Sequence, residues 1–163
     1  MPSSDHNVTL RPPRAEDGQA LHGLIAACPP LDCNSVYAYH LMARHFAATS
    51  VVAEQHDQII GAITGYRLPD DPTVLFVWQV AVAEAGRGQG LGTRMLTDLI
   101  ARCSGVSHMH TTIGPDNAAS RRSFEKLAGQ LGAPWSYHPF LTAAECGVGH
   151  EAEDLLVIGP IDH

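Results

Sequence analysis

A glycine-rich run directly after an apolar segment is the part of this sequence with the clearest chemical meaning. The run Arg87-Gly88-Gln89-Gly90-Leu91-Gly92 follows apolar residues 74–82 and precedes a helix-like stretch, residues 93–100. Glycines let backbone N–H groups approach one anion, and a helix N-terminus adds about half a positive charge. This order of strand, glycine loop and helix predicts a site for a phosphorylated ligand.

The spacing of the loop excludes two common phosphate-binding motifs. A Walker loop needs Lys followed by Ser or Thr, and this run has no such pair. A dinucleotide fingerprint needs Gly-x-Gly-x-x-Gly, and when the run is read from Gly86 the third glycine position is Leu91. The remaining pattern is Arg-x-x-Gly-x-Gly, at Arg87, Gly90 and Gly92.

After a Val-Ala-Val strand, this pattern resembles the acetyl-CoA pyrophosphate loop of the GNAT N-acetyltransferase superfamily. Residues 116–127 also carry the Asn-x-x-(Ala/Ser)-x-x-x-aromatic pattern of the superfamily's next helix. The alternative is a glycine turn that only connects a strand to a helix. The resemblance implies acetyl-CoA as co-substrate and no metal, because backbone N–H groups can polarise a thioester carbonyl. The cofactor-binding residues that it implies are Val80, Val82, Arg87, Gly88, Gln89, Gly90, Leu91, Gly92, Thr93, Asn117, Ser120 and Phe124.

Further segments resemble the diaminobutyrate acetyltransferase branch of this superfamily. They are residues 30–37, 75–82, 115–120 and 150–155, and with the loop the similarity spans nearly the whole chain after residue 8. The resemblance implies transfer of an acetyl group to the 4-amino group of L-2,4-diaminobutyrate. The product would be the precursor of the compatible solute ectoine.

A substrate with two ammonium groups and one carboxylate calls for acidic side chains and an aromatic wall. We expect Asp32 and Glu153 to face the ammonium groups and Trp78 to cover the methylene chain. Each has a structural alternative: a helix cap for Asp32, a core position for Trp78, and a solvated charge for Glu153. Neutral hydrogen bonds to the substrate are expected from Asn34, Ser35 and Tyr37, although Asn34 or Ser35 can also cap the following helix.

The substrate amine must lose a proton before it can attack. With a pKa near 10.4, only roughly one amine in 2,000 is neutral at pH 7, so reaching the neutral form costs about 4 to 5 kcal/mol. We expect Glu153 to act as the base, directly or through water, with Asp32 orienting the amine. His150 is the rival base, because imidazole changes charge near neutral pH.

The sequence departs from the superfamily pattern at the position that usually carries the general acid. Many members carry Tyr seven residues after the helix Asn, whereas this chain has Phe124 there. A phenyl ring donates no proton. Either the thiolate leaves unassisted, which its low pKa permits, or Tyr37, Tyr39 or a water donates.

Two other functions stay open at this point. One is acetylation of a different polycation, such as spermidine or an aminoglycoside. The other is a regulator that binds acyl-CoA without turnover, which the phenylalanine at the usual tyrosine position favours. A comparison of acetyl transfer to diaminobutyrate, ornithine and spermidine separates the two enzymes, and binding of coenzyme A without acetylation of any small amine identifies the regulator.

Composition narrows the class of protein. The 163 residues are 45% hydrophobic and 17% charged, which fits one globular domain. We expect it over residues 8–163, after a flexible N-terminus of residues 1–7. A net charge of −7 disfavours nucleic acid as a partner and suits a small cationic one.

The remaining expectations concern location, assembly and metal. No apolar run approaches twenty residues and the start lacks a signal-peptide layout, so we expect no membrane contact and a cytoplasmic location with four thiols. The resemblance implies a homodimer. His108-x-His110 would share one strand face, yet no third metal ligand is evident nearby.

The pattern of elements predicts an α/β fold. We expect a GNAT fold, with a mixed, mostly antiparallel central sheet that is splayed at the cofactor site and flanked by helices. The expected loop at residues 68–72 separates two strands. The expected strands are residues 9–12, 50–54, 59–66, 74–82, 107–113, 135–138 and 154–158, and the expected helices include residues 20–25, 36–42, 93–100 and 117–127.

Overall fold

One mixed sheet of seven strands organises the chain, and the computed structural model describes residues 7–163. The strand order is β1-β2-β3-β4-β5-β7-β6, in which β4 and β5 are parallel and the other neighbours antiparallel. The expected flexible segment lies, apart from Asn7, outside the described residues. The strands are β1 (Thr9–Arg11), β2 (Val51–Gln55), β3 (Gln58–Leu68), β4 (Asp71–Val82), β5 (His108–Ile113), β6 (Trp135–Leu141) and β7 (Glu153–Ile158).

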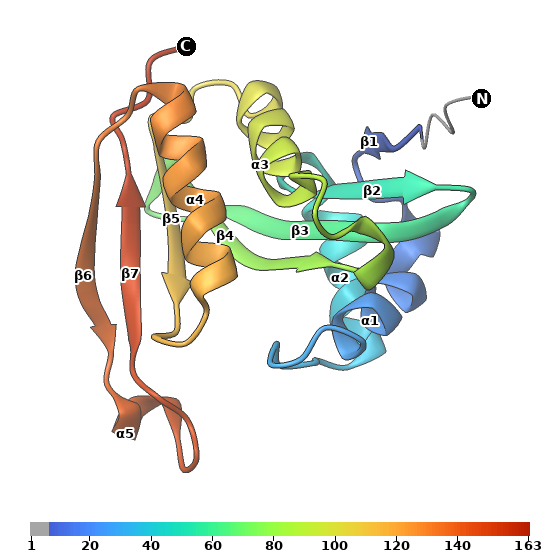
Figure 1. Ribbon diagram of the computed structural model, residues 1–163, viewed down its shortest axis with the longest axis horizontal. Coiled ribbons are helices and arrows are strands. Elements are labelled where there is room, and N and C mark those ends of the chain that lie inside the picture. The colour runs from blue at the N-terminus through green and yellow to red at the C-terminus, as the bar shows by residue number, and fades with distance from the viewer. Residues whose placement is uncertain (1–6) are drawn as a thin grey trace.

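Helices cover both faces of the sheet, with α3 and α4 on one face and α1 and α2 on the other (Figure 1). Each pair of helices has its own apolar cluster against the sheet. The α-helices are α1 (Gly18–Ala26), α2 (Val36–His45), α3 (Leu91–Arg102), α4 (Ala118–Leu131) and α5 (Ala143–Cys146). The 3₁₀ turns are η1 (Ala15–Asp17), η2 (Ala47–Thr49) and η3 (Glu84–Gly86). Among residues 7–163, no helix combines the length and apolar character that a bilayer crossing requires.

The two central strands separate towards their C-terminal ends. The pairing of β4 with β5 runs from Val74 opposite His108 to Val77 opposite Thr111. Beyond that point β4 continues for five residues to Val82, paired with β3 alone. The sheet is therefore splayed at this end, as the sequence predicted, and one edge of β4 is open.

A β-bulge lies where the separation begins. Thr64 of β3 pairs with Gln79, but the next residue, Gly65, pairs with Val77, so Trp78 has no partner on β3. A bulge of this kind bends the strand and redirects the side chains that follow it. The bulge thus sets which side chains of β4 face α1 and α2 beyond residue 78.

The helix after the glycine loop forms because its apolar residues recur at helical spacing. Leu91, Met95 and Leu99 are all at most 2% exposed and share the face that packs on the sheet. The preceding Gly90 adopts φ +66°, a left-handed conformation that starts the helix abruptly. Packing on one side and a sharp turn at the start together fix the direction of the helix N-terminus.

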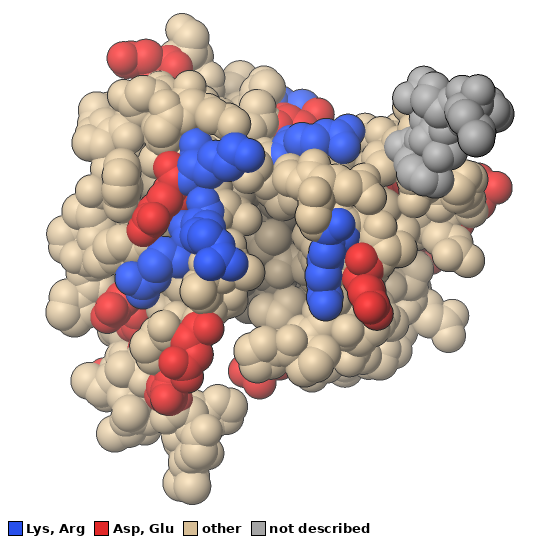
Figure 2. All heavy atoms as spheres, in the orientation of Figure 1, with Lys and Arg blue, Asp and Glu red and all other residues tan. Residues whose placement is uncertain are grey.

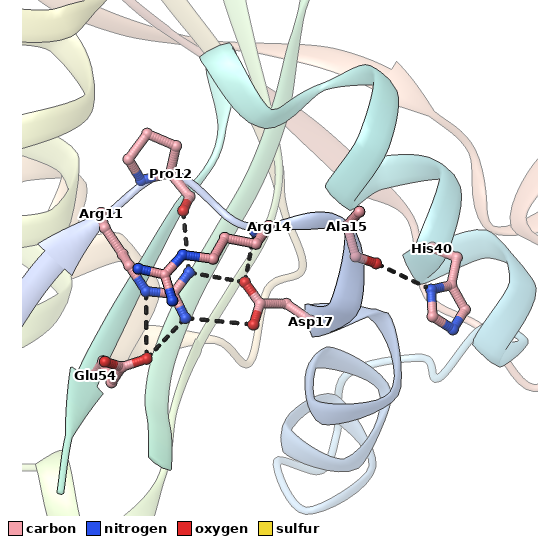
Figure 3. Close-up of polar contacts among 7 residues, drawn as sticks. All are labelled: Arg11, Pro12, Arg14, Ala15, Asp17, His40 and Glu54. Atoms are coloured by element: carbon pink, nitrogen blue, oxygen red, sulfur yellow. Dashed lines mark hydrogen bonds and ion pairs between the residues drawn. The ribbon is translucent and has the colours of Figure 1, made fainter. Parts of the chain in front are cut away.

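A cluster of charges ties the N-terminal strand to the sheet and to η1 (Figure 3). Arg11 of β1 lies 2.8 Å from the Asp17 carboxylate and 2.7 Å from that of Glu54 on β2. The Arg14 backbone N–H also donates to Asp17, at 2.6 Å. Burial by itself would raise the pKa of Asp17, but the hydrogen bonds from Arg11 and Arg14 hold that pKa below its ordinary value. We name Arg11, Asp17 and Glu54 the N-terminal ion cluster.

The predicted fold class is confirmed, and so is the predicted order of the main strands and helices. Several boundaries differ by a few residues, α5 was not predicted, and the turn between β3 and β4 has a clear physical reason. The expected loop of residues 68–72 shrinks to a tight turn, because β3 runs to Leu68 and β4 begins at Asp71, with which Leu68 pairs. Pro72 indicated a loop, but it stands at the exposed start of β4, where a strand tolerates a missing N–H.

Candidate active site

A groove of about 550 Å³ opens at the splayed end of the sheet. Four segments line it: residues 28–31 after α1, the end of β4, the glycine loop, and the first turns of α4. Figure 2 shows a hollow in the middle of this face of the molecule. Of the predicted cofactor-binding residues, those that line the groove are Val80, Val82, Arg87, Gly88, Gly90, Leu91, Gly92, Asn117 and Ser120.

The glycine loop is shaped by two left-handed residues. Gly88 has φ +78° and Gly90 has φ +66°, and a Cβ at either position would meet no atom within 4 Å. The need for glycine is therefore conformational rather than steric. With the chain turned this way, the first N–H groups of α3, which have no partner within the helix, point out of its N-terminus beside the groove.

The open edge of β4 offers backbone groups to the groove. The Ala83 N–H donates to the Ile60 carbonyl of β3 at 2.8 Å. Since successive residues of a strand face opposite edges, the backbone groups of Val82 and Val80 face away from β3, towards the gap. The Val82 carbonyl accepts from Arg87 Nε at 3.3 Å and from Cys28 Sγ at 3.5 Å.

The first turns of α4 supply the opposite wall. The Asn117 side chain caps the helix by accepting from the Ser120 N–H at 3.2 Å. Phe124 does not line the groove: its ring is 2% exposed and packs in the core with Leu127, while Ser123 lines the groove one position earlier. The structure gives Phe124 a packing role, and its contact with a cofactor stays a prediction.

Two other predicted cofactor residues lie on the outer side of the loop. Gln89 and Thr93 line a second cavity, of about 510 Å³, together with Arg94 of α3 and Lys126 of α4. The Gln89 side chain donates to the Ala85 carbonyl at 3.3 Å, and Thr93 is 7% exposed. Their part in cofactor binding also stays a prediction.

Positive charge is gathered around the groove although the chain as a whole is acidic. Figure 2 shows Lys and Arg side chains over α4 and again across the central hollow. Arg87 lines the groove, and Arg94 and Lys126 line the second cavity, which shares Gly90 with the groove. Cationic side chains around a helix N-terminus create a field suited to a polyanion such as a pyrophosphate.

The loop between α1 and α2 holds three of the predicted substrate residues. Ser35, not Asn34, caps α2, and its hydroxyl accepts from the Ala38 N–H at 3.2 Å. The Asp32 carbonyl accepts from the Gln79 side chain at 2.8 Å, and the Asn34 N–H donates to the Tyr39 hydroxyl at 3.3 Å. Because the backbone groups of Asp32 and Asn34 make these hydrogen bonds, the side chains of the two residues are not needed to hold the loop in place.

The two predicted aromatic contacts differ in how they are held. The half-buried Trp78 ring stacks on Tyr39, with centroids 6.3 Å apart and planes at 20°. Tyr37 is 71% exposed on α2. Tyr39, one of the candidate proton donors, is fully buried and gives its hydroxyl hydrogen to Gln79, so it does not face the groove.

The predicted base and its rival lie at the start of β7. Glu153 is half-buried opposite Leu141 of β6, just beyond the end of β5, and His150 is exposed in the preceding loop. Figure 1 shows the start of β7 and the α1–α2 loop at the same end of the molecule. Within residues 7–163 neither Glu153 nor Asp32 forms an ion pair, and neither lines the 550 Å³ groove.

Three histidines lie on strands of the sheet, namely His108 and His110 of β5 and His138 of β6. The described residues contain no group of three His, Cys, Asp or Glu side chains placed to hold a metal ion. His108 Nδ1 lies 2.9 Å from the Ser107 hydroxyl. Burial lowers the pKa of His110, and the neighbouring His108 adds to this effect.

Sequence reasoning missed several residues that build the site. Cys28 and residues 29–31 line the groove, and although residues 30 and 31 belong to the segment 30–37 that carries the resemblance, none of the four was predicted to contact the cofactor. Gln79 was visible as the one polar residue inside the apolar segment 74–82, but its partner is forty positions away. Ser123 lines the groove, but only its neighbour Phe124 was predicted to contact the cofactor.

Comparison with known proteins identifies a family for this geometry. The model of the acetyltransferase (GNAT) family matches residues 19–129. An L-2,4-diaminobutyric acid acetyltransferase of Bordetella parapertussis is 51% identical over 167 residues, covering 100% of this chain and 90% of the relative. A relative of the same name from Methylotuvimicrobium alcaliphilum is 45% identical, covering 94% of this chain and 91% of the relative.

A solved structure agrees with the fold over almost the whole chain. It is the diaminobutyrate acetyltransferase EctA from Paenibacillus lautus, in complex with its substrate L-2,4-diaminobutyric acid and coenzyme A. The superposition has a TM-score of 0.93 at 40% identity and covers 97% of this chain and 98% of that one. The splayed sheet and the glycine loop therefore belong to a fold known to hold coenzyme A.

Proposed function

Because this chain belongs to the acetyltransferase (GNAT) family, we propose that it moves the acetyl group of acetyl-CoA to the 4-amino group of L-2,4-diaminobutyrate. One observation carries the choice of substrate. A protein crystallised with that substrate and coenzyme A matches 97% of this chain at 40% identity. This identity and coverage support a shared groove as well as a shared fold.

The groove holds acetyl-CoA in this proposal. The pyrophosphate lies against residues 87–93, where backbone N–H groups, the start of α3 and Arg87 all favour negative charge. The pantetheine arm follows the open edge of β4 and pairs with the backbone of Val80 and Val82, as an added strand would. Asn117 and Ser120 flank it from α4. Arg87 leaves the Val82 carbonyl as the pantetheine arrives, since both use that acceptor.

The diaminobutyrate lies at the same end of the sheet, between the α1–α2 loop and the start of β7. Asp32 and Glu153 bind the two ammonium groups. Neither carboxylate forms an ion pair within residues 7–163, and this supports a ligand with two positive charges. Trp78 covers the methylene chain. Polar contacts come from Asn34, Ser35 and Tyr37.

The reaction is a direct attack of the amine on the thioester in a ternary complex. Glu153, directly or through one water, takes a proton from the 4-ammonium group; the neutral amine costs about 4 to 5 kcal/mol at pH 7, and a positioned base lowers the barrier to this proton transfer. The nitrogen then adds to the carbonyl carbon and loses its second proton to water, and the tetrahedral intermediate expels the coenzyme A thiolate, which is protonated by solvent. The low pKa of a thiol lets it leave without a strong acid, consistent with Phe124 where many relatives carry tyrosine.

The setting of the reaction is a finer part of the proposal. The product supplies ectoine, a compatible solute for osmoprotection, in the cytoplasm, and the enzyme works as a homodimer. Trp135 and Phe140 of the edge strand β6 are 47% and 49% exposed, which supports an assembly that covers this edge. Sedimentation velocity on the purified chain tests the dimer, and a monomer at all concentrations contradicts it.

The decisive experiment is a product assay with the purified chain. Acetyl-CoA is incubated with diaminobutyrate, ornithine or spermidine, and the products are analysed by mass spectrometry and NMR. We expect 4-N-acetyl-diaminobutyrate and far slower acetylation of the other two amines. Preferred transfer to spermidine overturns the substrate. Binding of coenzyme A in a calorimeter without acetylation of any amine overturns the activity.

A further inference from the structure

Tyr39 of α2 is the most deeply buried aromatic residue near the substrate end of the sheet. It is 0% exposed, and its ring lies between two others. Trp78 stacks on it with centroids 6.3 Å apart, and His22 meets it edge-on at 6.0 Å. The orientation of the Trp78 ring, the predicted wall of the substrate site, therefore depends on Tyr39.

The hydroxyl of the same tyrosine joins two elements that are distant in the sequence. It donates to Gln79 Oε1 at 3.0 Å and accepts from the Asn34 N–H at 3.3 Å. Gln79, which is 6% exposed, in turn donates from Nε2 to the Asp32 carbonyl at 2.8 Å. Two buried side chains thus fix the backbone at both Asp32 and Asn34.

The placement of Gln79 makes this arrangement specific to the site. Gln79 directly follows the bulge at Trp78 and precedes Val80, the first residue of β4 whose backbone faces the open edge beyond the bulge. A shift of Gln79 therefore moves the loop that carries Asp32. The same pair contacts Trp78 and the α1–α2 loop, and within residues 7–163 neither side chain forms a hydrogen bond or a ring contact with the glycine loop or α4.

We propose that Tyr39 and Gln79 are positioning residues for the amino-acid substrate, and that they set the geometry of its half of the site independently of the acetyl-CoA half. The inference rests on the proposed function, since it assigns Asp32, Asn34 and Trp78 to that substrate. The pair acts through those residues and does not touch the reacting atoms.

A contribution to stability does not explain well why Tyr39 and Gln79 place polar atoms in this part of the core. Its surroundings are apolar, with Leu21, Ile25 and Ala43 in the same cluster. A buried hydrogen bond contributes little net stability, because folding exchanges hydrogen bonds with water for hydrogen bonds within the protein. Polar groups that reach the backbone of one loop specify its position instead.

The test is Tyr39→Phe, which keeps the ring on Trp78 and removes the hydroxyl. We expect the KM for diaminobutyrate to rise about tenfold, because the Asn34 N–H and Gln79 Oε1 lose their partner and the loop loosens. The KM for acetyl-CoA should stay within twofold. KM does not depend on the amount of active enzyme, so partial misfolding lowers the apparent kcat without imitating this split.

A matched control is available on the opposite side of the molecule. The Tyr137 hydroxyl of β6 donates to Glu125 Oε1, also at 3.0 Å, and Tyr137 contacts Arg121 through its ring. Tyr137→Phe makes the same chemical deletion away from the substrate loop. We expect both KM values to be unchanged in this variant, whatever happens to its melting temperature.

Gln79→Met supplies the second arm, because its side chain has a similar length and no polar atom. It should reproduce the split between the two KM values, and the double variant should be no worse than the poorer single one, since the two residues act as one unit. The inference is overturned if both KM values rise equally, or if neither changes in a folded Tyr39→Phe protein. If the wild type fails to acetylate diaminobutyrate at all, the proposed function has failed instead.

Discussion

Carboxylates are ion-paired in the N-terminal ion cluster but not at the end of the sheet where we propose that the substrate binds, which we call the substrate end. In the cluster, Arg11 meets two carboxylates at 2.8 and 2.7 Å, and Asp17 also accepts a backbone N–H (Figure 3). At the substrate end, Asp32 and Glu153 meet no cation within residues 7–163. Charges that the fold satisfies internally hold elements together, whereas charges that it leaves unmatched are available to a ligand.

Backbone groups show the same contrast. The ladder between β3 and β4 pairs both strands along their length, while the other edge of β4 is open beyond Val77. Open backbone edges are costly in a folded protein unless water or a ligand satisfies them. Substitutions in the two regions should therefore have different effects. Those in the ion cluster should change the free energy of unfolding, and those at the groove should change kcat or KM.

The largest kinetic effect is expected from Glu153→Gln. Loss of the base should lower kcat at pH 7 by about 10²-fold or more, the usual contribution of a general base. The kcat of the variant should rise with pH, as solvent supplies the neutral amine that the wild type obtains through Glu153. Measurement of kcat from pH 6 to 10 checks both points.

Two companion variants sharpen that result. Glu151→Gln removes a carboxylate from an exposed neighbouring position and should leave kcat within twofold. His150→Gln tests the rival base. Should His150→Gln show the larger loss and Glu153→Gln keep an unchanged kcat and basic limb, the base is His150.

The loop provides the second prediction, through a pair of glycines with the same conformation. Gly90 (φ +66°) borders the groove, and Gly105 (φ +77°) lies in the turn after α3; a Cβ added at either residue would have no atom within 4 Å. Alanine at either position should cost about 1–2 kcal/mol of stability. Gly90→Ala alone should also raise the KM for acetyl-CoA about tenfold. Equal KM values in the two variants would remove the loop from cofactor binding.

The sequence predicted the strand, the glycine loop and the helix after it because these elements are adjacent along the chain. Strand, loop and α3 follow one another within residues 74–102, so the order of residue types already implies their geometry. The substrate half is assembled from residues far apart: Tyr39 and Gln79 are forty positions apart, and the bulge at Trp78 depends on how β3 pairs. No local pattern encodes such contacts, because tertiary packing decides them.

Side-chain direction was the other limit. The helix pattern correctly placed the N-terminal end of α4 at the groove, yet it could not show that Phe124 points into the core and Ser123 towards the groove. Adjacent positions on a helix differ by about 100°, and the orientation of the whole helix on the sheet decides which one is buried. Glu153 and Asp32 were predicted from the resemblance. They are far apart in the sequence, so the sequence alone does not show that the segments carrying them lie at the same end of the molecule.

The smallest effect is expected from Asp17→Asn in the ion cluster, and it should appear in stability alone. The pKa of Asp17 is held below its ordinary value, so the carboxylate stabilises the fold above about pH 4 and this contribution is lost as the pH falls through the folded-state pKa. At pH 7 the free energy of unfolding of the wild type should exceed that of the variant by on the order of 1 kcal/mol, the upper end of what an ion pair near the surface contributes. Urea unfolding from pH 7 downwards should show the two curves converging in acid, with both KM values unchanged at pH 7. A gap that persists below pH 3, or a change in either KM, would mean that the cluster also shapes the groove.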